Sequence, residues 1–305
     1  MQFVVKKVIK GKAYYYMQYS KYGVYLGESV PANIKKKLMN FFIQIGKEEV
    51  KKLDEEIIKA FAPKKIEAIE VMRHLFILIS RSELFSHEYQ NYLTDLTVRF
   101  TFNSNRSEGS KVTRKEVENI CLKNTRKPRS HIEREVFNSF SALRFAFSEK
   151  MNWNPLNVKR IHSLLLNNIA DPLIVGKWKT QNVVAPGNQT TTNPEYVGDE
   201  MKKLFEWLKE RKRAKMYPPL LATEFYIRFE AIHPFTDGNG RVGRILLNAL
   251  LFHFDYMPIV FFTQNHEAHC RAITKAIEGR PGTFNRHFVE QAKKTIELIK
   301  IGLLI

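Results

Sequence analysis

The sequence predicts a mainly α-helical protein with a small β-rich segment at its amino terminus. From about residue 86 onward, apolar residues recur at the three- and four-residue spacing typical of helices. Aromatic and β-branched residues typical of strands are concentrated in residues 1–30. Residues 171–196 are rich in Gly, Pro, Asn and Thr, which predicts a long loop between helices.

The composition is that of a globular chain with a large basic excess. Of its 305 residues, 44% are hydrophobic and 26% are charged, which excludes disordered, collagen-like and disulfide-scaffold proteins. Lys and Arg number 49 and Asp and Glu number 31, so the net charge is +18. This excess predicts contact with nucleic acid, a phosphorylated ligand or an acidic protein surface. Two widely separated cysteines favour a reducing cytoplasm, and neither a secretory signal nor a membrane span is indicated.

The first hundred residues are expected to form an extension, residues 1–100, that precedes a core at 101–305. Two aromatic strands with a turn at residues 21–23 predict a β-hairpin. Helical spacing then predicts one helix over residues 32–60 and a second over 66–84.

The core is expected to consist of helices around the long loop at 171–196. A short hairpin is expected in this loop around residues 181–184, and loops of such length are usually functional. Helices are predicted at residues 114–122, 133–147, 158–168, 197–210, 220–232, 242–253, 266–277 and 285–301.

Residues 233–244, HPFTDGNGRVGR, combine residue types that suit phosphate chemistry. Pro234 disfavours continuation of the preceding helix, so His233 is expected at a helix end. Two glycines flank an asparagine at 238–240, which allows left-handed backbone angles and a tight turn. The N–H groups of such a turn, and of the helix that follows it, favour a bound anion.

The helix after this loop is apolar nearly all round, yet it carries Arg241, Arg244 and Asn248 at helical spacing. Buried arginines need an anionic partner, which is either a polyphosphate or an acidic side chain. Taken singly, each polar residue of the segment also fits a structural ion pair or a helix cap. Together they favour phosphate chemistry, because a base, a metal ligand, an anion-binding turn and paired cations all occur within one segment.

The segment resembles the signature of the Fic family, HPFx(D/E)GN(G/K)RxxR, at every fixed position, and residues from about 100 to 295 are similar to a Fic core. The resemblance implies a Fic-type helical bundle with a β-hairpin flap. It also implies a protein adenylyltransferase, which uses ATP and Mg²⁺ to transfer AMP to a Ser, Thr or Tyr hydroxyl of a target protein. The aromatic hairpin and the first helices resemble the amino-terminal extension of many Fic proteins.

By matching position, the resemblance assigns a role to each polar residue of the segment. His233 is the general base that takes the proton of the target hydroxyl, and Asp237 is the Mg²⁺ ligand. The other matching residues would hold the phosphates. Gly238, Asn239 and Gly240 would form the turn around the α- and β-phosphates, and Arg241 and Arg244 would bind the β- and γ-phosphates.

Residues 104–109, SNRSEG, resemble the inhibitory motif of the family, (S/T)xxxE(G/N), through Ser104, Glu108 and Gly109. If Glu108 pairs with Arg244, it occupies the place of the γ-phosphate, and ATP binds only in an unproductive pose. We therefore expect Glu108→Gly to raise AMP transfer. In some Fic proteins the same glutamate helps to remove AMP, and whether Glu108 does so is left open.

The loop at 171–196 resembles the flap of the family, which lays a target segment beside the site by strand addition. The flap is expected at about residues 177–190. Its expected docking residues are Lys177, Thr180, Val183 and Val184. Self-modification and a homodimer are left open.

Two other functions are weighed against AMP transfer. A nucleic-acid-binding regulator with a secondary Fic core would account for the basic excess, including the run at residues 209–215, but no clear helix-turn-helix is evident. A Fic enzyme that transfers phosphate, UMP or phosphocholine is the other alternative, although residues 238–240 keep the pattern of AMP transfer. A zinc site at residues 266–270, HEAHC, is less expected than a helix surface, because the histidine spacing is not that of H-E-x-x-H.

Overall fold

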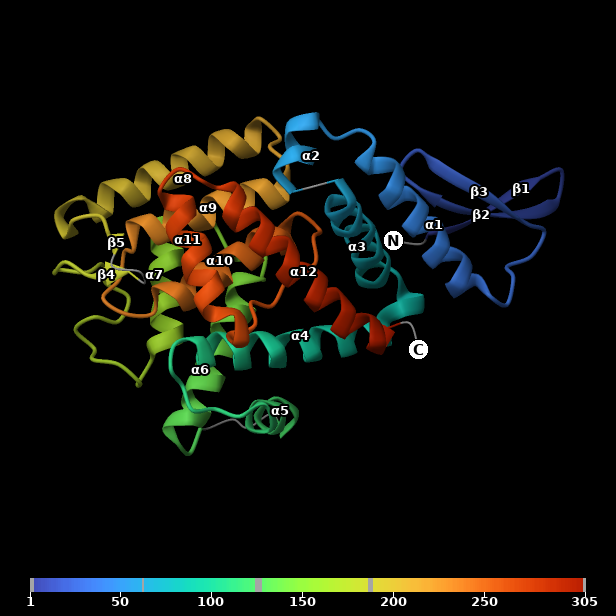
Figure 1. Cartoon of the computed structure of the whole chain (residues 1–305). Coiled ribbons are helices and arrows are strands. Elements are labelled where there is room, and N and C mark those ends of the chain that lie inside the picture. The colour runs from blue at the N-terminus through green and yellow to red at the C-terminus, as the bar shows by residue number, and fades with distance from the viewer. Residues whose placement is uncertain (1–2, 62, 124–127, 186–188, 304–305) are drawn as a thin grey trace. The chain divides into compact units, whose positions relative to one another are not determined.

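The computed structural model describes residues 3–61, 63–123, 128–185 and 189–303, which form two compact units (Figure 1). We name these the amino-terminal unit, with residues up to Leu93 together with 255–257 and the chain from Ile296, and the core unit, with 94–254 and 258–295. The predicted division at residue 100 stays a prediction. Residues 255–257 and the chain from Ile296 also belong to the amino-terminal unit, so a single boundary along the chain does not separate the two units.

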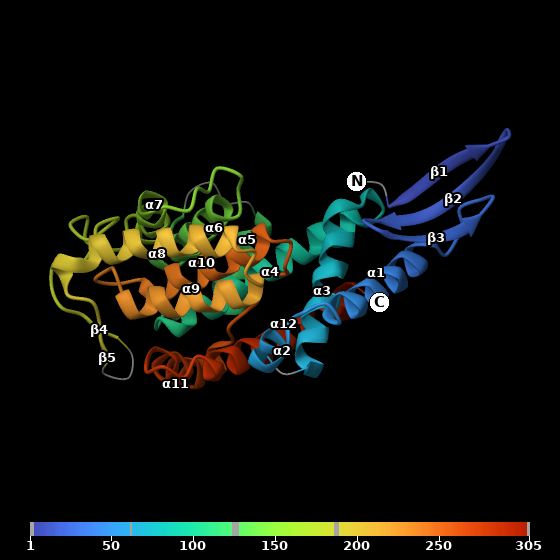
Figure 2. The ribbon, with the colours of Figure 1, turned by 90° about the horizontal axis from the view of Figure 1, so that it is seen from above.

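The amino-terminal unit contains a three-stranded antiparallel sheet in the order β1 (Val4–Ile9), β2 (Lys12–Tyr19) and β3 (Tyr22–Gly27) (Figure 2). The predicted hairpin is β2 with β3, and its turn falls at residues 20–21, where Ser20 has a φ of 52°. The prediction missed β1, because consecutive lysines interrupt the alternation of VVKKVI. This strand is paired to β2 across a turn in which Lys10 and Gly11 have φ values of 49° and 79°.

The predicted helix over residues 32–60 is wrong, because the segment forms two helices, α1 (Ile34–Val50) and α2 (Glu55–Phe61). The N–H groups of Lys52 and Leu53 bond to carbonyls three residues back, which tightens and ends α1. The helix α3 (Pro63–Arg81) packs along α1, and a short 3₁₀ turn follows at Glu83–Phe85. Gly46 permits this packing, since a Cβ atom there would lie 2.6 Å from the Cα of Val71.

The core unit is a helical bundle around α9 and α10, with α6, α7, α8 and α11 packed against them or each other (Figure 1). The helix α4, which ends one residue before Glu108, had no predicted bounds, because its second half is rich in Thr, Asn and Arg. The helices from α4 onward are α4 (Ser86–Ser107), α5 (Arg114–Lys123), α6 (His131–Ala146), α7 (Pro155–Leu166), α8 (Val197–Arg213), α9 (Pro218–Ile232), α10 (Asn239–His253), α11 (His266–Ile277) and α12 (Gly282–Leu303).

The helix α10 is buried along most of its length, as its apolar sequence predicts. Arg244 on this helix is only 3% exposed, and burying its charge is costly unless the charge is paired. Among the described residues, no helix combines the length and the apolar character needed to cross a membrane.

The loop at 171–196 carries a minimal hairpin, β4 (Val184–Ala185) with β5 (Gln189–Thr190). Val184 pairs with Thr190, and Ala185 pairs with Gln189. Residues 186–188 of the expected flap lie outside the described residues. The predicted hairpin around residues 181–184 therefore lies a few residues later along the chain.

Candidate active site

His233 stands where α9 ends. Its backbone is left-handed, with a φ of 50° and a ψ of 63°, and its N–H donates to the carbonyl of Phe229 at 2.9 Å. A non-glycine residue in this region is uncommon, and such strain is concentrated at functional sites. Pro234 follows directly and prevents the helix from continuing. The predicted position of His233 at a helix end is confirmed.

The loop after His233 is braced by Asn239. Its side-chain Oδ1 accepts from the N–H of Phe235 at 2.9 Å, and its Nδ2 donates to the carbonyl of Phe235 at 2.8 Å. Phe235 itself is fully buried. The side chain of Asn239 therefore holds the shape of the loop, and its amide groups are occupied within the protein.

The two glycines of the loop are small for different reasons. Gly238 has a φ of 78° and caps the start of α10, so it needs left-handed freedom. Gly240 lies within α10, and the expectation of a left-handed angle there is wrong. A Cβ atom on Gly240 would lie 2.5 Å from Oε1 of Glu108, so this glycine provides space for that carboxylate.

Asp237 and Arg241 form an ion pair at the first turn of α10. Nη2 of Arg241 donates to Oδ2 of Asp237 at 3.1 Å, and Oδ1 of the aspartate accepts from the N–H of Gly238 at 2.6 Å. The side chain of Asp237 is 56% exposed, whereas that of Arg241 is 10% exposed. The aspartate therefore keeps its carboxylate open to solvent and to a cation.

The predicted contact between Glu108 and Arg244 is present. Nη2 of Arg244 donates to Oε1 of Glu108 at 2.7 Å and to the carbonyl of Ser104 at 3.1 Å, and its Nε donates to Oγ of Ser104 at 3.1 Å. Burial raises the pKa of the Glu108 carboxyl, but the charge and hydrogen bond of Arg244 outweigh it and hold that pKa below its usual value. Glu108 is therefore an anion at neutral pH.

Residues 104–109 lie at the end of α4, a helix that packs in an apolar cluster. Valines from α4, α5, α6 and the segment between α4 and α5 form a small apolar cluster, of which Val98 on α4 is a member. The helix ends at Ser107. The N–H of Glu108 then bonds to the carbonyl of Asn105 at 3.0 Å, and Gly109 has a φ of 87°. Glu108 thus projects from a helix end, and its side chain stays 24% exposed.

Sequence reasoning missed His162 on α7, which links two loops. The N–H of Gly176 donates to Nδ1 of His162 at 2.8 Å, so the other nitrogen, Nε2, carries the proton toward the carbonyl of Asp237 at 3.0 Å. Its ring stacks on Phe235, with centroids 3.8 Å apart. Burial lowers the pKa of His162 to about 4, so it is neutral near pH 7. Both its partners are backbone groups, which leave no pattern in the sequence.

Lys179 is a second residue that sequence reasoning missed. It is 2% exposed, its N–H donates to the carbonyl of Pro234 at 2.9 Å, and its Nζ donates to Oγ1 of Thr191 at 2.7 Å. The same Nζ lies 3.4 Å from the carbonyl of Ile232. These contacts lie on both sides of His233, so Lys179 attaches the flap to the loop that holds the histidine.

The expected docking residues lie near the surface of the flap. Lys177, Thr180 and Val184 are exposed, and Val183 is half-buried. Docking of a target there stays a prediction.

No group of three or more His, Cys, Asp or Glu side chains in the described ranges is arranged to hold a metal ion. At residues 266–270, His269 is buried and its Nε2 lies 2.9 Å from the hydroxyl of Tyr226. A bound Mg²⁺ usually takes one or two carboxylates and completes its shell with substrate phosphates and water. The single open carboxylate of Asp237 fits that kind of binding, although not a metal cage made of protein groups alone.

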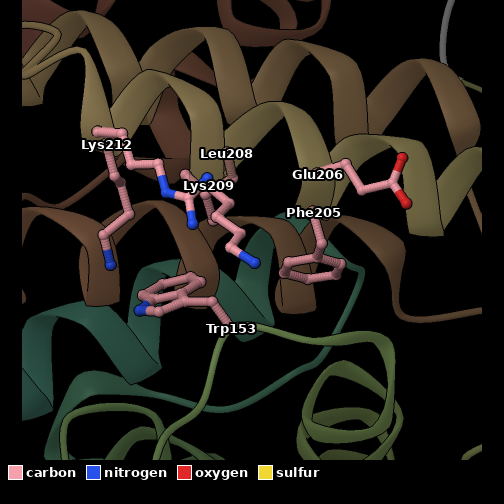
Figure 3. A pocket seen from close by; sticks show the side chains of 7 residues that line it. Trp153, Phe205, Glu206, Leu208, Lys209 and Lys212 are labelled. Carbon is pink, nitrogen blue, oxygen red and sulfur yellow. The ribbon is translucent and has the colours of Figure 1, made fainter.

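Three residues of the basic run at 209–215, Lys209, Lys212 and Arg213, line a separate cavity of about 510 Å³ (Figure 3). In this view Lys209 and Lys212 reach from α8 to either side of Trp153, and Phe205 lies below the helix. The lining includes none of the predicted site residues.

With the geometry of the loop established, the chain can be compared with known proteins. Residues 153–251 match the model of the Fic/DOC family, and this range contains the whole signature. This chain carries a Fic domain. The protein adenylyltransferase fic-1 of Caenorhabditis elegans is 28% identical over 141 residues, which are 46% of this chain and 27% of that protein. The protein adenylyltransferase Fic of Drosophila ananassae is 28% identical over 150 residues, 49% of this chain and 30% of that protein. The Fic-domain chain therefore matches less than a third of the length of these relatives.

Solved structures confirm the mainly α-helical, Fic-type fold. A Fic-domain signalling protein from Bacteroides thetaiotaomicron superposes with a TM-score of 0.65 at 18% identity, over 77% of this chain and 96% of that one. A fragment of Fic-1 from C. elegans gives a TM-score of 0.68 at 20% identity, over 88% and 85% of the two chains. The likeness extends beyond residues 153–251 and includes much of the chain that precedes the signature.

Proposed function

We propose that this Fic-domain protein transfers AMP from ATP to a hydroxyl side chain of a target protein. One observation carries the proposal: a carboxylate, that of Glu108, lies on the buried Arg244 beside the first turn of α10, where a phosphate would bind. The start of a helix favours a bound anion, and in the proposed inhibited state the carboxylate of Glu108 occupies the place of the phosphate. The matched relatives are named protein adenylyltransferases, which supports the same reaction.

In the proposed reaction, His233 accepts the proton of the target hydroxyl, whose oxygen forms a bond to the α-phosphorus of ATP. The bond between the α-phosphorus and its bridging oxygen breaks, and pyrophosphate leaves. The backbone N–H groups at residues 238–240 and the guanidinium groups of Arg241 and Arg244 hold the phosphate oxygens. Such fixed donors act by positioning and by stabilising charge in the transition state.

We assign the metal ligand to Asp237. A bound Mg²⁺ neutralises charge on the phosphate oxygens, and the exposed carboxylate of Asp237 would hold it. This carboxylate also accepts from Arg241 at 3.1 Å, so the arginine restrains it while it stays exposed.

Glu108 is the proposed inhibitor. Its carboxylate neutralises Arg244 and lies above Gly240, so a γ-phosphate on Arg244 requires that Glu108 leave. The γ-phosphate and the carboxylate of Glu108 cannot both accept from the same donors of Arg244. ATP therefore binds either without a contact between its γ-phosphate and Arg244, or after the end of α4 has moved Glu108 away.

The target protein, with its Ser, Thr or Tyr acceptor, is proposed to dock at the flap, and the chain itself is one candidate target. A cytoplasmic location is supported by the two cysteines, Cys121 and Cys270, neither of which forms a disulfide.

The proposal is tested with ATP labelled at the α-phosphate and, in parallel, at the γ-phosphate. Wild type, Glu108→Gly and His233→Ala are incubated with Mg²⁺ and a cell extract as a source of targets. We expect α-label on protein with wild type, about tenfold more or greater with Glu108→Gly, and none with His233→Ala. Incorporation of γ-label that is lost with His233→Ala, in place of α-label, would show phosphate transfer by this chain. Equal α-label with all three proteins would overturn both the base and the inhibitor.

A further inference from the structure

Two buried polar atoms without hydrogen-bond partners lie close together at the end of α9. Within the described chain, Nδ1 of His233 and Oε1 of Glu230 are both buried and unsatisfied. The other carboxylate oxygen of Glu230, Oε2, lies 3.6 Å from Nδ1 of His233. The side chains are 7% and 10% exposed for Glu230 and His233, so neither group is solvated as it would be in water. Buried polar atoms without partners are rare and call for an explanation.

The neighbouring helix leaves room for this carboxylate. A Cβ atom on Gly243 of α10 would lie 2.5 Å from Oε1 of Glu230 and 2.7 Å from Cε2 of Tyr226. Any larger residue at 243 would displace the glutamate or separate α9 from α10. The glycine between the two signature arginines therefore makes space for a charged group next to the histidine.

We propose that Glu230 is a positioning residue that sets the tautomer of His233 and stabilises the protonated imidazole. The inference rests on the proposed role of His233 as the general base. When the carboxylate accepts the Nδ1–H of the neutral ring, the proton stays on Nδ1, and Nε2 is free to accept the proton of the target hydroxyl. After that transfer the ring carries two protons and a positive charge, which the adjacent carboxylate stabilises. A closure of about 0.7 Å brings 3.6 Å to hydrogen-bond distance, and such contacts often tighten when substrate binds.

The other ionisable groups around the pair do not replace this carboxylate. Nζ of Lys179 lies on the carbonyl that precedes His233, so it brings positive charge, which disfavours a protonated ring. Glu230 also interacts electrostatically with one side chain on each of α9, α10 and α11: Tyr226, Arg244 and Cys270. Of Tyr226, Arg244 and Cys270, only Arg244 is a full charge, and in the wild type it is neutralised by Glu108.

The test compares Glu230→Gln with a matched control, Glu224→Gln, in the full-length Glu108→Gly chain. Glu224 is a half-buried carboxylate on the same helix and is not part of the site. At saturating ATP we expect Glu230→Gln to lower kcat about tenfold to a hundredfold with the KM for ATP within twofold, and to move the acid limb of the kcat–pH profile down by about half a unit or more. Glu224→Gln leaves the kcat, the KM and the profile unchanged.

A second measurement does not need AMP transfer. The C2–H proton resonance of His233, identified by its loss in His233→Gln, is titrated by NMR in Glu230→Gln and in its wild-type parent, in which Glu108 neutralises Arg244. Nitrogen shifts in the parent report whether Nδ1 is protonated in the neutral ring. We expect the Nδ1–H form and a titration midpoint about half a unit lower or more in the variant. Equal midpoints overturn the inference, as does a parent ring protonated on Nε2. If Glu108→Gly transfers no AMP, the proposed function fails, and the NMR result still decides the coupling between Glu230 and His233.

Discussion

Each unit of the molecule buries a charge, and the two charges differ in how firmly their partners are held. Glu70 on α3 in the amino-terminal unit is 1% exposed, accepts from the hydroxyl of Tyr256 at 2.5 Å and lies 3.5 Å from Arg73. Arg244 in the core unit is equally buried, but its carboxylate partner is at the exposed end of α4. Tyr256, which donates to Glu70, is 3% exposed and cannot leave without local unfolding, whereas the proposed function requires that Glu108, whose side chain is 24% exposed, leave Arg244.

The difference indicates what each buried charge does. A charge enclosed by fixed partners contributes to the stability and specificity of the fold. A charge whose partner stands on a helix end can exchange that partner for a ligand of the same sign. Lys179 is a third case, since its partners in the described chain are a hydroxyl and carbonyls. Variants of these residues test the comparison, in order of the expected change in the free energy of unfolding.

The largest effect is expected for Glu70→Ala. The change leaves the buried hydroxyl of Tyr256 without this acceptor and removes the carboxylate beside the partly exposed Arg73, and losing such a buried partner costs about 3 kcal/mol. Urea unfolding followed by circular dichroism measures the loss, with the exposed Glu67→Ala on the same helix as a control. A loss below about 1 kcal/mol would show that Glu70 is no more firmly held than a surface charge.

Lys179 is expected to make stability depend on pH. Burial lowers the pKa of Lys179 from 10.5 to about 8. Between these pH values the unfolded chain keeps the proton that the folded chain has lost, so the free energy of unfolding rises as the pH increases from 8 to 10.5. Below pH 8 both states are protonated, and the cost of burying the charge is fully present.

Urea unfolding of wild type and Lys179→Met at pH 7.5 and pH 10 isolates this contribution. Relative to the variant, we expect wild type to gain about 2 kcal/mol between the two pH values. The exposed Lys177→Met serves as the control, for which we expect no such difference. A constant difference between wild type and Lys179→Met would show that the buried ammonium is solvated or paired.

These three charges also show where sequence reasoning succeeds and where it fails. The segment at 233–244 is local, so the proline that follows His233 is enough to place this histidine at a helix end. The pairing of Glu108 with Arg244 spans 136 residues and became predictable only through a resemblance that links two motifs. Lys179 and His162 bind backbone carbonyls of distant loops, and a carbonyl is present at every position, so no residue type marks the partner.

The fold was predictable to a similar degree. Helix periodicity located the helices of the core unit that follow α4, because their apolar faces recur regularly. It failed at residues 51–54, where two helices follow each other without a glycine or proline to mark the break. It also failed at β1, which lacks alternation, and at Gly240, where the need for a glycine comes from a residue 132 positions earlier in the chain, Glu108.

An intermediate effect is expected for Glu108→Gly, whose activity was treated above. Its free energy of unfolding should fall by only about 1–2 kcal/mol, because Arg244 keeps two hydrogen bonds to Ser104 and water can enter where the carboxylate lay. Addition of Mg²⁺ and ATP should then raise the melting temperature of the variant by more than that of wild type, since a bound ligand stabilises the folded state. Thermal unfolding with and without nucleotide measures both quantities. A larger shift in wild type would mean that Glu108 does not compete with ATP.

The smallest change in stability is expected for Asp237→Asn. The pair of Asp237 with Arg241 is exposed on the aspartate side, and exposed pairs contribute about 0–1 kcal/mol. Asparagine retains an oxygen that can accept from the N–H of Gly238, so the turn keeps its cap. If Asp237 is the Mg²⁺ ligand, the concentration of Mg²⁺ for half-maximal AMP transfer rises by about tenfold or more, although the melting temperature barely changes. An unchanged Mg²⁺ requirement in the variant would show that Asp237, like Glu70, only pairs with groups of the protein and does not bind the metal.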